Sequence, residues 1–263
     1  GREILQAPSV MVDFKILYKI VGRLLFLEAA FMLCCVFIAL WHQEDDLIAF
    51  IASMLLTIVA GVMFVFFGRG AGNNMSRKEA YLVVTVTWIV FSIFGMLPFL
   101  ISGYITNITD AYFETMSGFT TTGATILDDV ECLPHGILFW RSLTQWIGGL
   151  GIVFFTIAIL PSMVGGSMKV FSAEATGPIK SKMHPRLTTS AKWLWSIYLA
   201  LTIACGVSYW LAGMDWFDSL NYSMTTTATG GFSTHNDSTL HFNSVSIDYI
   251  SILFQFLSGM NFI

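Results

Sequence analysis

DAYFETMSGFTTTGAT (residues 110–125) and DSLNYSMTTTATGGFS (residues 218–233) decide the fold, because these two segments are copies of one pattern. At an offset of 108 positions the copies share an aspartate at the start, a methionine in the middle, and a threonine and a glycine near the end. An apolar run precedes each copy and another follows it. Internal repeats of this kind are usual in transport proteins.

Each copy predicts a short helix that crosses only half of a membrane. Residues 110–119 would form a helix of about 15 Å at 1.5 Å per residue, which is half of the hydrocarbon thickness of about 30 Å. Asp110 and Asp218 are suitable N-caps for the two helices. The C-terminal end of such a helix carries a partial negative charge at the bilayer centre and attracts cations.

A loop of small polar residues follows each predicted half-helix. Non-helical backbone at membrane depth is tolerated only where it is buried in protein or lines a water-filled path, and successive carbonyls in such a loop can replace the water shell of an ion. Gly123 and Gly231 supply the positive φ that such a loop needs. A threonine-rich external loop with turn glycines is the alternative for either copy alone, and the duplication favours a pore hairpin.

Apolar runs long enough to cross a membrane surround both hairpins. A spanning helix needs about 20 mostly apolar residues. Five runs qualify or nearly so, and a sixth begins near Ser246 and is still apolar at Ile263. The five are residues 21–40, 47–67, 80–101, 136–160 and 191–212.

The composition agrees with a membrane protein and excludes two other classes. Of the 263 residues, 55% are hydrophobic and 11% are charged, and the mean hydropathy is +0.71. Soluble domains are about 25% charged, so a soluble enzyme is not expected. A formal net charge of −4 leaves no basic face for nucleic acid.

The charges also predict the topology. All but one of the 13 basic residues flank the spans on a single side, which the positive-inside rule assigns to the cytoplasm together with the N-terminus. Most acids lie on the other side and predict a negative outer vestibule. These acids are Glu44, Asp45, Asp46, Asp110, Glu114, Asp128, Asp129, Glu131, Asp215, Asp218, Asp237 and Asp248.

The remaining basic residue, Arg141, falls inside the fourth apolar run. An intramembrane charge is costly and is usually paired, so we expect a structural ion pair with Asp110, Glu114 or Asp128. Three glycines nearby (148, 149 and 151) predict close approach of neighbouring helices, with a hinge in the span as the alternative.

An intramembrane enzyme would need a nucleophile and a base within reach, or a metal cluster. No such spacing involves Glu114, Arg141 or a histidine, so we expect no enzyme. The loop histidines are scattered without metal-ligand spacing, and the sequence predicts no zinc site. These histidines are His135, His184, His235 and His241.

Three segments carry a family resemblance: ETMSGFTTTGAT (114–125), MTTTATGGFSTH (224–235) and RSLTQWIGGLGIVFF (141–155). Together they resemble the Trk/Ktr/HKT superfamily of potassium transporters. The likeness is closest to the N-terminal half of the bacterial Trk-type potassium-uptake membrane subunit and covers essentially the whole chain. The resemblance implies an all-α polytopic membrane protein with repeated helix–pore helix/filter loop–helix units of potassium-channel type.

The resemblance also implies a selectivity filter with one glycine per repeat, here Gly123 and Gly231. Potassium is then the transported ion, without an organic cofactor, and would contact Thr121, Thr122, Gly123, Thr229, Gly230 and Gly231. The whole filter would comprise Thr121, Thr122, Gly123, Ala124, Thr125, Thr229, Gly230, Gly231, Phe232 and Ser233.

For partners and location, the resemblance implies membrane lipid, a homodimer and a cytosolic nucleotide-binding regulatory subunit. The basic stretch 161–190 would contact lipid headgroups or form a docking surface for that subunit. The protein would lie in the bacterial cytoplasmic (inner) membrane.

The predicted organisation is a two-span extension (1–79), a first pore repeat (80–190) and a second repeat truncated in its last span (191–263). The family has four repeats, so we expect a fragment of a longer protein, the alternative being two chains that share one pore. Two functional alternatives also remain, namely a non-conducting sensor or assembly subunit and a sodium- or proton-coupled cation symporter.

Overall fold

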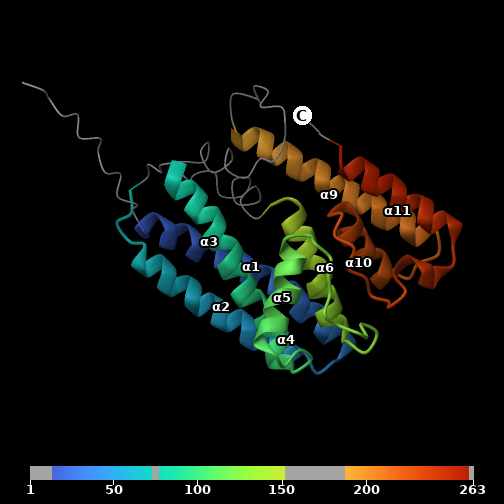
Figure 1. Ribbon diagram of the computed structural model, residues 1–263, viewed down its shortest axis with the longest axis horizontal. Helices are drawn as coiled ribbons and strands as arrows, with labels where there is room; N and C mark the ends of the chain where they lie inside the picture. Colours follow the sequence, from blue (N-terminus) through green and yellow to red (C-terminus); the bar gives the residue numbers. More distant parts are fainter. Residues whose placement is uncertain (1–13, 73–76, 152–186, 261–263) are drawn as a thin grey trace, which may run out of the picture.

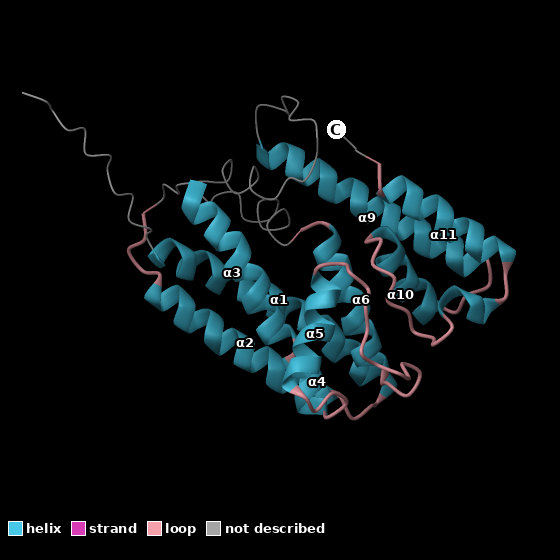
Figure 2. Cartoon of the chain, viewed as in Figure 1, coloured by secondary structure: helices cyan, strands magenta, loops and turns pink. Residues whose placement is uncertain are grey.

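The computed structural model describes residues 14–72, 77–151 and 187–260, and every regular element within them is helical (Figures 1 and 2). The predicted all-α class is therefore confirmed. The elements are α1 (Phe14–His42), α2 (Leu47–Phe67), α3 (Arg77–Gly95), α4 (Leu97–Ser102), α5 (Ile108–Phe119), α6 (His135–Gly149), α9 (Leu187–Leu211), α10 (Trp216–Thr227), the 3-10 turn η1 (Ser238–Phe242) and α11 (Val245–Ser258).

Four stretches of these helices are long and apolar enough to cross a membrane. They are Phe14–His42, Leu47–Phe67, Glu79–Ser102 and Trp193–Leu211, and they match four of the predicted runs. The predicted run 136–160 corresponds to α6 at its start, and its residues after 151 lie outside the described part. The sixth run begins as α11, one residue before the predicted start.

The first two helices form a tightly packed pair. A Cβ atom added at Gly22 of α1 would lie 2.8 Å from the Cβ atom of Phe64 of α2, which shows that small residues permit the close approach. α1 also packs against α3 and α6, so the pair supports the helices that follow it (Figure 1).

α6 packs against both half-length helices, α5 and α10. A Cβ atom at Gly148 would overlap the carbonyl oxygen of Phe119, the last residue of α5. A Cβ atom at Gly149 would lie 2.9 Å from the Cα atom of Ala228, the C-cap of α10. The predicted close approach is confirmed at both glycines, and the end of α6 lies between the ends of α5 and α10.

The buried hydrophobic residues form two clusters. The larger spans α1 to α6 and includes Phe217 and Met224 of α10. The smaller joins α9, α10 and α11 around Cys205, Tyr209 and Phe254. α10 therefore packs on both sides, and the loop that follows it lies against α6.

Candidate functional site

The two half-length helices end in the same hydrogen-bond pattern. In α5, Thr122 N–H donates to Ser117 O and Thr121 N–H donates to Gly118 O, both at 2.9 Å. In α10, Gly230 N–H donates to Thr225 O at 2.9 Å and Thr229 N–H donates to Thr226 O at 3.0 Å. Each pair is a Schellman motif, so the two chain reversals at the start of the candidate filter loops have the same geometry.

A threonine occupies the left-handed position of each motif. Thr121 and Thr229 both have a φ of 53°, where a side chain normally costs about 1–2 kcal/mol. The sequence predicted positive φ only at the glycines, and nothing in it marks a β-branched residue for this conformation. The same strained geometry at both positions, 108 residues apart, indicates a shared constraint on the two loops.

The N-cap of each half-length helix lies three residues before the predicted one. Asn107 caps α5 by accepting from Thr109 N–H at 2.9 Å, and Asp215 caps α10 by accepting from Asp218 N–H at 2.7 Å. The assignments of Asp110 and Asp218 as N-caps were therefore wrong, because both aspartates lie in the first helical turn. α5 and α10 are each 12 residues long, so half-membrane length is retained.

The two candidate filter loops meet at their glycines. Gly123 and Gly231 have φ angles of 75° and 88°, as the sequence predicted. A Cβ atom added at Gly123 would overlap the carbonyl oxygen of Gly230 in the second loop. A Cβ atom at Gly231 would meet nothing within 4 Å. Gly123 is therefore required for loop contact as well as for its φ, whereas Gly231 is required for its φ alone.

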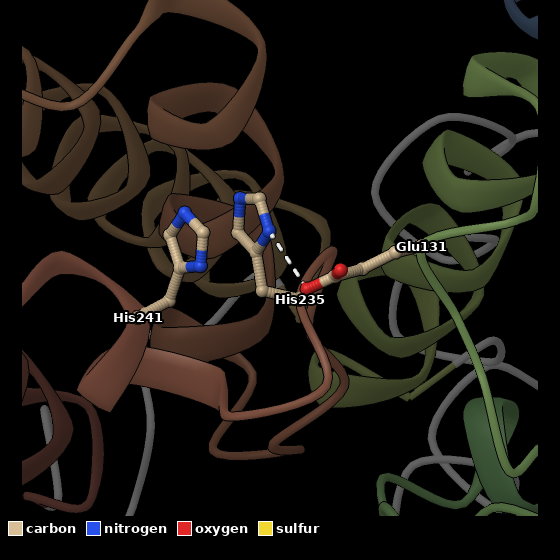
Figure 3. Close-up of side chains that lie close together, drawn as sticks. All are labelled: Glu131, His235 and His241. Carbon is tan, nitrogen blue, oxygen red and sulfur yellow. Dashed lines mark ion pairs between the residues drawn. The ribbon is translucent and has the colours of Figure 1, made fainter.

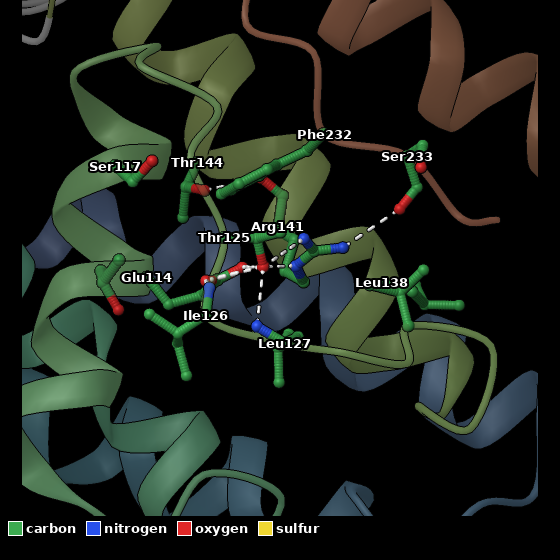
Figure 4. A network of polar contacts seen from close by, with 12 residues as sticks. Glu114, Ser117, Thr125, Ile126, Leu127, Leu138, Arg141, Thr144, Phe232 and Ser233 are labelled. Atoms are coloured by element: carbon green, nitrogen blue, oxygen red, sulfur yellow. Dashed lines mark hydrogen bonds and ion pairs between the residues drawn. The ribbon is translucent and has the colours of Figure 1, made fainter. Parts of the chain in front are cut away.

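A buried ion pair connects both loops (Figure 4). Arg141 Nε lies 2.9 Å from Glu114 Oε1, and their side chains are 2% and 0% exposed. Glu114 also accepts from Thr125 Oγ1 at 2.9 Å and from Ile126 N–H at 3.1 Å in the first loop. Of the three acids considered as partners of Arg141, the structure places Glu114 beside it.

Arg141 also contacts the second loop, through Nη1 and Cζ of its guanidinium group. Nη1 donates to Ser233 O at 3.1 Å, and Cζ lies 4.3 Å from the centre of the Phe232 ring. Figure 4 shows this guanidinium between Glu114 and Ser233. One side chain of α6 thus fixes the first loop through Glu114 and the second loop directly.

Gln145, one turn further along α6, also supports the second loop. Its side chain is fully buried, and Oε1 accepts from Phe232 N–H at 3.1 Å. A Cβ atom at Gly230 would overlap the Gln145 amide, so the loop backbone lies directly on it. Nothing in the sequence pattern indicated this contact.

The predicted filter residues differ in their exposure and in the hydrogen bonds that their carbonyls accept. Thr122, Ala124, Thr125, Thr229 and Gly231 are exposed, whereas Gly230 and Phe232 are buried. The Ala124 carbonyl accepts from Ser117 Oγ at 2.6 Å, and the Ser233 carbonyl accepts from Arg141. These two carbonyls are the least suited of the set to coordinate an ion.

The predicted negative vestibule needs a correction. Glu114 is fully buried and paired with Arg141, and Asp46 is also fully buried, against the start of α6 at Gly136. Neither carboxylate faces an approaching cation. Sequence position placed both on the outer side but did not reveal that the fold encloses them.

Comparisons with known proteins show the family to which this chain belongs. The TrkH family model, described as cation transport protein, matches residues 47–263. The chain belongs to the TrkH family. It is 41% identical over 253 residues to the Trk system potassium uptake protein TrkH of Vibrio parahaemolyticus, covering 95% of this chain and 52% of that protein. It is 36% identical over 244 residues to the Trk system potassium uptake protein TrkG of Escherichia coli K12, covering 92% of this chain and 50% of that protein.

A solved TrkH structure shows the same fold. The crystal structure of the potassium transporter TrkH from Vibrio parahaemolyticus superposes with a TM-score of 0.81 at 38% identity, covering 95% of this chain and 50% of that one. The chain thus spans about half the length of the TrkH-family relatives that it matches. Family membership and the four spanning stretches together show a membrane protein of a cation transport family.

Proposed function

We propose that this chain supplies two repeats of a potassium-selective pore. The filter would comprise residues 121–125 and 229–233, with potassium contacting backbone at Thr121, Thr122, Gly123, Thr229, Gly230 and Gly231. The observation that supports this most strongly is the identical chain reversal at the ends of α5 and α10, with the two loops meeting at Gly123 and Gly230. The relatives named as potassium uptake proteins support the choice of ion.

The supporting contacts suit a filter physically. Carbonyl dipoles select potassium over sodium only if the loop keeps the oxygens in place. Glu114, Arg141 and Gln145 are all buried, and each bonds the loop backbone from behind. The helix C-termini at the start of each loop add partial negative charge. The ion-facing side therefore consists of backbone, and the side chains act as positioning residues.

Two loops cover only part of the circumference of an ion. We propose that the remaining loops come from further repeats of a full-length protein, in line with the relatives about twice as long. The organisation would be a two-span extension (1–79), a first repeat (80–190) and a second repeat (191–263). The whole protein would be a homodimer in the inner membrane with a cytoplasmic N-terminus, gated by a nucleotide-binding subunit and without enzymatic activity.

Ion flux tests this proposal. The full-length protein that contains this chain, reconstituted into liposomes, is expected to carry potassium in preference to sodium. Equal flux of both ions would contradict the filter assignment. Complete absence of flux in the presence of the regulatory subunit would favour a sensor or assembly subunit, and flux that requires a sodium or proton gradient would favour a symporter.

A further inference from the structure

Three side chains with metal-ligating atoms gather where the two repeats meet. Glu131 comes from the first loop region, His235 follows the second filter loop, and His241 lies in η1 (Figure 3). One ligand atom from each lies within 4.8 Å of the others. The prediction that the histidines are scattered was wrong for His235 and His241, whose rings are stacked. The sequence did not reveal the group because Glu131 lies more than 100 positions before them.

Of the two ring nitrogens of His235, Nε2 has a hydrogen-bond partner and Nδ1 has none among the described residues. Nε2 lies 2.9 Å from Asp218 Oδ2, and Asp218 Oδ1 accepts from Thr234 Oγ1 at 2.6 Å. Because a carboxylate only accepts, Nε2 carries a hydrogen toward Asp218, and in the neutral ring Nδ1 then carries the lone pair. Nδ1 is buried and has no hydrogen-bond partner among the described residues.

That lone pair faces a carboxylate. Nδ1 of His235 lies 3.4 Å from Oε1 of Glu131 (Figure 3). Two acceptor atoms that face each other repel unless a positive charge lies between them, and an imidazole nitrogen and a carboxylate oxygen are both ligands of zinc. The Asp218–His235 contact is also the usual support of a metal-bound histidine, where a carboxylate fixes the tautomer and the ring orientation.

His241 completes the set by turning its ring. The two imidazoles are stacked with centres 3.6 Å apart at 3° between the ring planes. A metal lies in the plane of each imidazole that binds it, so stacked rings cannot share one ion. His241 is exposed, which leaves its ring free to rotate toward the nitrogen of His235 and the Glu131 carboxylate.

The backbone around the cluster is held together without a metal. Val130 N–H donates to Asn236 Oδ1 at 2.8 Å, and Asn236 Nδ2 donates to Asp129 Oδ1 at 2.9 Å. These contacts fix the segment that carries Glu131 against the segment that carries His235. Binding therefore requires side-chain rotation and little backbone movement.

We propose that Glu131, His235 and His241 bind one first-row transition-metal dication of the zinc type, with water as a further ligand. Imidazole and carboxylate ligands suit such ions better than magnesium or calcium, which prefer sites built wholly of oxygen atoms. The bound ion joins the two repeats beside the second candidate filter loop. This site does not depend on the proposed transport of potassium.

Zinc titration of the purified full-length protein tests the site by calorimetry or by competition with a fluorescent chelator. Wild type binds one zinc ion at this site. His241→Ala and Glu131→Gln change exposed side chains, so the fold is retained, and each weakens zinc binding at least about tenfold, because even loss of a supporting outer residue costs 10–100-fold. The matched control is His135→Ala, which removes a histidine that is bonded to Glu44 elsewhere.

A variant outside the ligand set and a spectroscopic signature complete the test. Asp218→Asn weakens zinc binding by about 10–100-fold while all three ligands remain. X-ray absorption of the zinc complex shows two imidazole nitrogens in wild type and one in His241→Ala. No zinc binding by wild type, or the same affinity in wild type, His241→Ala and Glu131→Gln, overturns the proposal.

Discussion

Arg141 of α6 and Glu114 of α5 form a buried ion pair at 2.9 Å, and between them they bond both candidate filter loops. The pair is enclosed by protein and not by solvent, because the side chains are 2% and 0% exposed. Each charge therefore depends on the other, and the geometry of the two loops depends on both.

Loss of either charge is expected to destabilise the protein strongly. Removing one partner of a buried pair leaves an uncompensated charge and costs about 3–5 kcal/mol. Glu114→Gln and Arg141→Met should each lower the thermal unfolding midpoint in detergent. The double variant should cost less than the sum of the two single ones, because the partners are coupled. Arg69→Met is the control, since Arg69 is exposed, and a similar loss there would contradict this reading.

The two filter glycines should respond differently to alanine. Gly123→Ala introduces a clash with the Gly230 carbonyl in addition to backbone strain, whereas Gly231→Ala introduces strain alone. We expect Gly123→Ala to reduce both potassium selectivity and stability, and Gly231→Ala to reduce selectivity with a smaller loss of stability. Ion flux in liposomes and thermal unfolding measure the two effects.

Gly213→Ala is the matched control for the glycines. Gly213 has a φ of 105° and room for a Cβ atom, like Gly231, but lies outside the candidate filter loops. Equal selectivity in Gly213→Ala, Gly231→Ala and wild type would argue against the filter assignment.

The buried amide of Gln145 should matter for selectivity more than for folding. Gln145→Met keeps the approximate volume but removes the acceptor of Phe232 N–H, which leaves that buried donor unpaired at a cost of about 1–3 kcal/mol. The second loop should then lose its fixed position, and the potassium-to-sodium flux ratio should fall. Ser142→Ala removes a buried hydroxyl on the same helix that donates to Leu138 O, and its flux ratio should stay at the wild-type value.

Replacing either left-handed threonine with glycine should raise the stability of the folded protein. Thr121→Gly or Thr229→Gly relieves about 1–2 kcal/mol of backbone strain, offset in part by the greater flexibility of the unfolded chain. A rise in the thermal unfolding midpoint is therefore expected. Thr85→Gly, at an exposed helical position in α3, should lower it instead. A drop in all three variants would show that the threonine side chains stabilise the loops.

Asp46 should make stability depend on pH. Burial and the neighbouring Glu44 raise the pKa of Asp46 from 3.8 to about 6. Between these values the folded protein keeps a proton that the unfolded chain has released, so stability falls as pH rises from about 4 to about 6 and levels off above. Asp46→Asn removes this fall and should be more stable than wild type at pH 7.

Thermal unfolding of wild type and Asp46→Asn across this pH range measures the effect. The control Asp45→Asn, at the adjacent exposed position, should keep the wild-type pH profile. Parallel profiles for Asp46→Asn and wild type would exclude Asp46 as the source.

The sequence predicted the parts of the fold that depend on local pattern. Run length and hydropathy were enough for the spans, and the duplicated hairpin was enough for two half-length helices followed by glycines with positive φ. Boundaries shifted where capping decided them, because Asn107 and Asp215 compete with the aspartates three residues later.

The contacts between elements could not be predicted in the same way. Glu114 and Arg141 are 27 positions apart, and the sequence offered Glu114 as one of three possible partners without selecting it. Gln145 and Phe232 are 87 positions apart, and nothing in the local pattern indicates their contact. The left-handed threonines ran against propensity, since β-branched residues avoid that conformation. The histidine cluster was missed because its ligands come from two repeats that each lack a complete set.

α6 precedes the second loop in the sequence, so the residues that hold this loop are made before it. Arg141 and Gln145 bond Ser233 and Phe232, which are synthesised about 90 residues later. Because a chain emerges from the ribosome N-terminus first, α6 is synthesised before the second loop that it contacts. Assembly of the pore would then follow the order of translation, with the closing helix of one repeat acting as the template for the next.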